Sequence, residues 1–172
     1  MSLMQATRPL DPWRWLGWPA ALSVMATLIL AMPFRVLQLQ LPEPVFPIVL
    51  AFSWAVIRPS VLAPFVLLGL GLFLDFFWGG PLGLWPLSLL TPYATLLGTR
   101  SVMSGQSRGM RQFWFASTTA LALGTGYLLT AVTAVAFPSL AATFWQFLAT
   151  SLLYPLAHQL IERFEDADVR FR

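Results

Sequence analysis

The side chains that could carry chemistry are few and isolated. Asp75 is the only acid in the apolar stretch 61–78, where a carboxylate normally has a partner or a function. Intramembrane aspartyl proteolysis needs two carboxylates that share a proton, and this stretch supplies one. His158 is the only histidine, and no serine in a recognisable nucleophile elbow accompanies it. One histidine and one buried acid cannot fill the coordination sphere of a metal ion, so we expect neither an enzyme nor a metal or cofactor site.

Glycines flank Asp75 at intervals of four residues. On a helix, Gly71, Asp75 and Gly79 fall along one stripe, where small residues let a neighbouring backbone approach closely. A carboxylate just before a Gly-Gly-Pro turn can accept backbone N–H groups at the start of the next helix. We therefore interpret Asp75 as a structural fastening. A further hypothesis pairs Asp75 with Arg35, the one basic residue expected on the same side of the membrane.

Other polar residues also favour structural roles. His158 precedes Glu162 by four residues, which predicts an interfacial hydrogen-bonded pair on a helix. A 3-4-3 pattern of small residues predicts a tightly packed helix face, at Ser88, Thr91, Thr95 and Gly98. Prolines within the apolar segments predict helix kinks, at Pro64, Pro86, Pro92 and Pro155.

The composition indicates an integral membrane protein. Hydrophobic residues make up 58% of the 172 residues and charged residues only 10%, and the mean hydropathy is +0.72. All ten basic residues are arginine, and they are not gathered on one solvated face as nucleic-acid binding would require. There is no cysteine, which excludes disulfides and thiolate metal sites.

The apolar runs predict an all-α bundle of six transmembrane helices, forming one integral membrane domain over residues 1–172. We expect helices at about 16–34, 44–57, 61–78, 82–99, 112–137 and 140–161, and a cytoplasmic tail at 162–172. With both chain ends in the cytoplasm, only Arg35 lies outside. The arginines that then lie inside are Arg8, Arg14, Arg58, Arg100, Arg108, Arg111, Arg163, Arg170 and Arg172. This distribution follows the positive-inside rule.

The middle of the chain resembles a known family. The segments "FSWAVIRPS" (52–60) and "GLGLFLDFFWGGPLGLWPLSLLTPYATLLGTR" (69–100) are similar to the MreD family of bacterial rod-shape-determining membrane proteins. The positions that carry the resemblance are Trp54, Arg58, Pro59, Gly71, Asp75, Gly79, Gly80, Pro81, Leu82 and Gly83.

The resemblance implies a non-enzymatic scaffold of the cell-elongation machinery in the bacterial inner membrane. Its implied partners are a single-pass MreC-like protein, the MreB filament, the RodA polymerase and a penicillin-binding protein. The implied fold is similar to the substrate-binding subunits of energy-coupling-factor vitamin transporters. An alternative function is therefore that of a small-molecule carrier subunit, but the outer loops carry only Arg35 and Glu43 as charges, which gives little with which to capture a polar ligand.

Overall fold

A computed structural model describes residues 13–31, 43–57, 60–103, 106–134 and 138–169 of the chain. These residues form helices and contain no strand, which confirms the all-α prediction. A π-helical turn, η1 (Trp13–Gly17), runs into the first α-helix. The α-helices are α1 (Trp18–Leu30), α2 (Phe46–Ile57), α3 (Ala63–Trp78), α4 (Leu84–Met103), α5 (Arg108–Ala134), α6 (Leu140–Ser151) and α7 (Tyr154–Val169).

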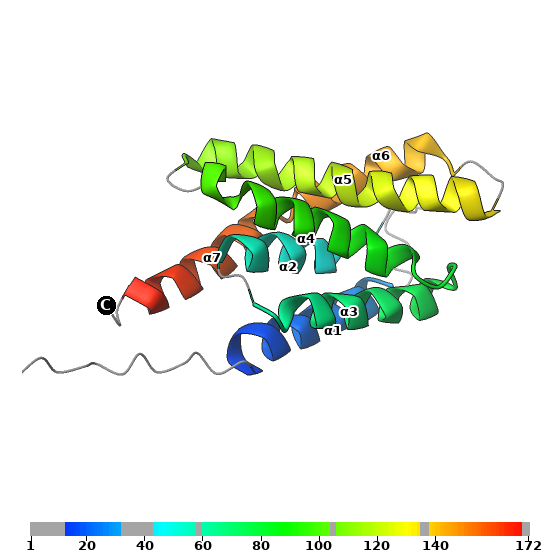
Figure 1. Cartoon of the computed structure of the whole chain (residues 1–172). Coiled ribbons are helices and arrows are strands. Elements are labelled where there is room, and N and C mark those ends of the chain that lie inside the picture. Colours follow the sequence, from blue (N-terminus) through cyan, green and yellow to red (C-terminus); the bar gives the residue numbers. More distant parts are fainter. Residues whose placement is uncertain (1–12, 32–42, 58–59, 104–105, 135–137, 170–172) are drawn as a thin grey trace, which may run out of the picture.

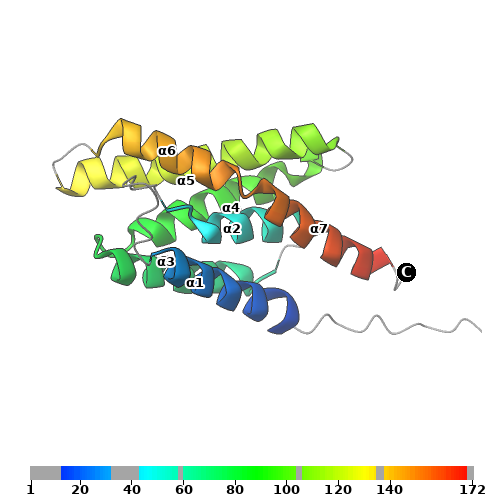
Figure 2. The ribbon, with the colours of Figure 1, turned by 180° about the vertical axis from the view of Figure 1, so that it is seen from behind.

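The helices stack in three layers, with α5 and α6 on one side, α2 and α4 in the middle, and α1 and α3 on the other side (Figures 1 and 2). Helix α2 is the centre of the core, since every residue from Pro47 to Ala55 is buried. It contacts α1, α3, α4, α5 and α7. A helix that is apolar on all sides can be buried on all sides, and α2 has no charged residue to prevent this.

The last predicted span is divided into two helices. Helix α6 ends at Ser151 and α7 begins at Tyr154, with Pro155 in its first turn. Proline lacks the N–H that would bond to the carbonyl four residues earlier, and its ring clashes with that carbonyl. Helix α7 continues to Val169, so residues 162–169, expected as a tail, are helical.

Three of the four prolines expected to kink helices instead lie in first turns. Pro64 and Pro155 are each the second residue of their helix, and Pro86 is the third residue of α4. A first turn tolerates proline because its N–H groups have no intrahelical partner. Only Pro92 lies inside a helix, in α4.

One end of the bundle carries the described arginines and is termed the basic end. There Arg100 Nη2 donates to the carbonyl of Ile57, the last residue of α2, at 3.1 Å. Arg108 Nη2 lies 3.4 Å from Glu162 Oε1, which joins the start of α5 to α7. The first contact brings the C-terminal ends of α2 and α4 together, and the second brings the N-terminus of α5 to α7.

The opposite end carries Glu43 and Asp75 and is termed the acidic end. Glu43 Oε2 accepts from Trp78 Nε1 at 3.3 Å, and the Glu43 carbonyl accepts from Gln146 Nε2 at 3.3 Å. The backbone N–H of Val45 donates to Thr150 Oγ1 at 3.1 Å. The entry into α2 is thus held between α3 and α6.

Within the described residues, two helical stretches are long and apolar enough to cross a membrane: Arg108–Thr133 of α5, and Leu140–Arg163, which spans α6 and α7. Helices α2 and α3 are apolar but shorter. Length and composition thus suggest membrane association, while six spans with both ends in the cytoplasm stay a prediction.

Candidate functional site

The Asp75 carboxylate fastens α3 to the start of α4. Its side chain sits in the last turn of α3 and is 1% exposed. Oδ2 accepts from the backbone N–H of Gly83 at 2.6 Å, and Oδ1 accepts from that of Trp85 at 2.9 Å. Because α4 begins at Leu84, these are two of the donors that a helix N-terminus leaves unpaired. A carboxylate there also interacts favourably with the helix dipole, and the sequence-based interpretation of Asp75 is confirmed in its hydrogen bonds.

The turn between α3 and α4 needs glycine at two positions. Gly79 ends α3 in the left-handed conformation, with φ at 64°, and its N–H bonds to the Asp75 carbonyl. Gly80 donates to the same carbonyl at 3.1 Å. Gly83 has φ at 95°, which orients its N–H toward the Asp75 side chain. Asp75 therefore organises the turn through its backbone as well as its carboxylate.

The turn is completed by the two motif residues between these glycines. The Pro81 carbonyl accepts from Leu84 N at 3.2 Å, which leads the chain into α4. The Leu82 side chain is 70% exposed and projects from the turn without contributing to the core.

Gly71 provides the close helix contact that the glycine stripe predicts. A Cβ added at this residue would come within 2.5 Å of the Cα of Pro86 on α4. Gly79, on the same stripe, has nothing within 4 Å of such an atom and is required by its backbone angle instead. The stripe therefore combines one packing glycine with one turn glycine.

Trp54 lies in the core beside α1. It is fully buried, and its Nε1 donates to the carbonyl of Trp15 at 3.2 Å. Arg58, Pro59 and Arg35 lie outside the described residues, so the Arg35–Asp75 pair stays a hypothesis. Asp75 already has two hydrogen-bond donors without it.

Sequence reasoning missed an aromatic cluster beside the hairpin that α3 and α4 form with the turn 79–83. The rings of Trp78 and Trp85 are 4.8 Å apart at 56°, and Trp78 also donates to Glu43. Their separation by seven residues does not indicate a contact, because the two rings meet only after the chain reverses between α3 and α4. No spacing in the sequence links Glu43 to Trp78.

A second polar cluster joins α5 to α7 at the basic end. His158 Nε2 lies 3.1 Å from Glu162 Oε1, so the two side chains are neighbours as predicted, but the contact lacks the geometry of the predicted hydrogen bond. The imidazole stacks on Tyr154 at 5.9 Å and 7°, and Tyr154 Oη donates to the Arg108 carbonyl at 3.0 Å. The described residues contain no group of three or more potential metal ligands. These contacts tie helix ends together.

The small-residue face predicted on α4 is only partly buried. Ser88 is fully buried, and a Cβ added at Gly126 of α5 would lie 3.0 Å from its Oγ. Thr95 and Gly98 are exposed, so the prediction that this whole face packs within the bundle is wrong. Helix α4 packs against α2, α3 and α5, and the side that carries Thr95 and Gly98 is left uncovered.

The hairpin of α3 and α4 thus aligns these two helices and caps the N-terminus of α4. Within the described residues, both oxygens of the Asp75 carboxylate bond to backbone N–H groups. Comparison of the chain with protein-family models, curated proteins and solved structures finds no match.

Proposed function

We propose that this chain is a membrane scaffold of the MreD type, which acts in bacterial cell elongation by packing against an MreC-like single-pass protein. The observation that carries the proposal is the motif from Gly71 to Gly83. It resembles the family in sequence, and in the structure it works as one unit, with Gly71 against Pro86 and Asp75 on the start of α4. A residue set that the fold uses as a unit is a better family marker than hydropathy alone.

The proposed location is the inner membrane, with six spans and both chain ends in the cytoplasm. The start of α1, the end of α4 and the start of α5 lie toward one end of the bundle (Figure 1). These segments carry Arg14, Arg100, Arg108 and Arg111, and their arginine content supports this orientation. The sixth span would be the α6–α7 pair. The complex would also contain the MreB filament, the RodA polymerase and a penicillin-binding protein.

Such a scaffold would act without catalysis, through helix packing in the bilayer. Small exposed residues allow a partner helix to approach closely, and α4 presents Ala94, Thr95 and Gly98 on its exposed side. Other exposed surfaces carry larger side chains, such as Phe144 and Trp145 on α6. The exposed side of α4 is therefore the surface at which we would seek the partner.

Site-specific crosslinking tests the proposal. A photoreactive residue replaces Thr95 in one variant and Phe144 in a control variant, each in the tagged full-length chain in bacterial membranes. The proposal expects Thr95 to crosslink to a single-pass protein of the MreC type and Phe144 to give much less product. Co-purification of transporter ATPases with a bound vitamin, and no single-pass partner, would instead establish the carrier alternative.

A further inference from the structure

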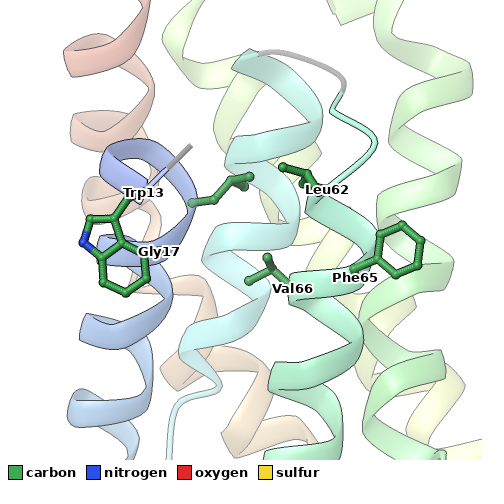
Figure 3. A pocket seen from close by; sticks show the side chains of 6 residues that line it. Trp13, Gly17, Leu62, Phe65 and Val66 are labelled. Carbon is green, nitrogen blue, oxygen red and sulfur yellow. The ribbon is translucent and has the colours of Figure 1, made fainter. Parts of the chain in front are cut away.

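Two features of the described residues lie apart from the Asp75 hairpin. One is an open apolar groove between the start of α1 and the first turns of α3, with Trp13 on η1 and Val66 on α3 (Figure 3). None of the residues that line it carries a charge. The other is the polar cluster between α5 and α7, which holds His158, the only histidine of the chain. This cluster, unlike the groove, contains a side chain that can change its charge near neutral pH.

The His158 side chain is largely buried, with 16% of its surface exposed. Neither Nδ1 nor Nε2 has a hydrogen-bond partner among the described residues. Nε2 nevertheless lies 3.1 Å from Glu162 Oε1, which is close enough for an ion pair once the ring gains a proton. A buried imidazole nitrogen without a partner is costly, because it has lost water and gained no hydrogen bond. Proton uptake would replace this unfavourable state with a charge-assisted contact.

The Glu162 carboxylate is shared between two helices. The same Oε1 lies 3.4 Å from Arg108 Nη2 at the start of α5. The Arg108 side chain is 77% exposed, so water and salt weaken its attraction for the carboxylate more than they weaken that of the buried imidazole. A protonated His158 would therefore be the stronger competitor for Glu162. The carboxylate would then pair within α7, and one link to α5 would be lost.

The charges around His158 come from α5 and α7. Its ring stacks on Tyr154, whose hydroxyl donates to the Arg108 carbonyl. The charges of Arg111, Arg108 and Glu162 all act on that hydroxyl. Helix α2, which packs against α7, and helix α6, which precedes it, contain no charged residue. An imidazolium would thus add a positive charge beside two arginines of α5, and their repulsion would loosen the contact between α5 and α7 further.

We propose that Arg108, Tyr154, His158 and Glu162 form a clasp between α5 and α7 that opens when His158 takes up a proton. With a neutral imidazole, Glu162 links Arg108 to α7 and the two helix ends stay together. Protonation favours the state that holds the proton more tightly. That is the open state, in which Glu162 is no longer shared and the arginines are further away. The closed population therefore falls as the pH falls from about 8 to about 5.

Distance measurements between two spin labels test this clasp. The natural chain has no cysteine, so Gln112→Cys on α5 and Gln159→Cys on α7 provide the only labelling sites. Both positions are exposed. The full chain in detergent is compared at about pH 7.5 and about pH 5.5, on either side of the range in which histidine titrates. An exposed ion pair shifts an equilibrium by about twofold to fivefold, so the ratio of short to long distances should fall by that factor at the lower pH.

Variants separate the two partners of the clasp. His158→Gln removes the only histidine and should make the distances independent of pH over this range. Glu162→Gln removes the shared carboxylate and should give a low ratio already at the higher pH. Glu43→Gln changes an acid at the other end of the bundle and should keep the wild-type response. A wild-type ratio that does not change with pH overturns the proposal, and so does a wild-type response in His158→Gln.

The single histidine also allows its protonation to be followed directly, without any substitution at the clasp. Nuclear magnetic resonance of the full chain with isotope-labelled histidine gives one imidazole signal. Proton uptake between about pH 8 and about pH 5, in step with the change in distance, supports the clasp. An imidazole that stays neutral down to about pH 5 overturns it, even if the His158→Gln chain does not fold. The inference does not depend on the proposed partner, so partner crosslinking at Thr95 can succeed or fail independently.

Discussion

At Asp75, two backbone donors replace the water that a carboxylate loses on burial. Gly83 and Trp85 donate from the first turn of the next helix, so the same contacts also satisfy that helix. The arrangement needs both oxygens of the side chain. It also needs the positive φ of Gly83, which turns the N–H inward. Asp75 and Gly83 therefore act together as one structural unit.

Substitution of Asp75 tests the structural role of this carboxylate. Asp75→Ala leaves both donors without an acceptor and should lower the free energy of unfolding by about 2–4 kcal/mol. Asp75→Asn should cost less, because it keeps one acceptor oxygen while its NH₂ faces the second donor. Thermal unfolding in detergent measures the order of stability of the wild type and the two variants. Glu43→Gln, which neutralises another acid at the acidic end, serves as the control. A fully stable Asn variant that has lost partner capture would contradict the structural interpretation.

Two glycines on α3 provide a matched pair for the helix contact. Gly71→Ala forces a methyl group into the backbone of Pro86 and should destabilise the fold by about 1–3 kcal/mol. Gly69→Ala meets nothing within 4 Å and should be neutral or stabilising by up to about 1 kcal/mol, through helix propensity. Unfolding midpoints of the two variants provide the comparison. Equal effects would show that α3 and α4 are not in close contact at Gly71.

The residue roles differ in how far the sequence could predict them. The bonding of Asp75 was predictable, because its acceptor and donors are within ten residues and the turn between them is marked by glycine and proline. The partner of Gly71 was not, since contact with Pro86 depends on the register of two helices. The bond from Trp78 to Glu43 likewise depends on how distant segments meet.

At the scale of elements, the burial of α2 makes its ends critical. The helix has 12 residues, and the last carbonyls of any helix lack intrahelical partners. Arg100 supplies one donor, reaching from the last turn of α4 to the carbonyl of Ile57. One arginine thus links the ends of two helices and supplies a donor to a carbonyl at the end of α2.

Removal of this arginine should loosen the basic end. We expect Arg100→Ala to lower stability by about 1–2 kcal/mol, through loss of a hydrogen bond from a charged donor. Arg163→Ala is a suitable control, because Arg163 is exposed and makes no hydrogen bond with another described residue. Hydrogen exchange should then show faster exchange near the C-terminus of α2 in the first variant only. Identical exchange in both variants would refute the capping role.

The positions of the helices along the chain were more predictable than the sides of each helix that are buried. Apolar runs predicted a helix in each of the six segments, because hydrophobicity alone marks them. The break between α6 and α7 was predicted only as a kink at Pro155, whereas α6 ends four residues earlier, at Ser151. Spacing could not decide that Ser88 is buried and Gly98 exposed, since both fall on the same predicted stripe.

For the molecule as a whole, the two ends differ in charge and in the kind of contact they make. The basic end uses arginines on helix termini, whereas the acidic end uses Asp75 on backbone donors and Glu43 on Trp78. Side chains at each end thus join segments that are distant in sequence. We expect this asymmetry to orient the bundle in a bilayer, with the basic end in the cytoplasm.

Single cysteines can test that orientation, because the natural chain has none. Ser107 and Ser139 are both exposed and both precede a helix, at the starts of α5 and α6. Joined by the long helix α5, they lie at opposite ends of the molecule. A membrane-impermeant maleimide should label Ser139→Cys in intact cells and label Ser107→Cys only after permeabilisation, since the arginines favour the cytoplasm. The reverse pattern would refute the orientation, and equal labelling in intact cells would refute a membrane-spanning α5.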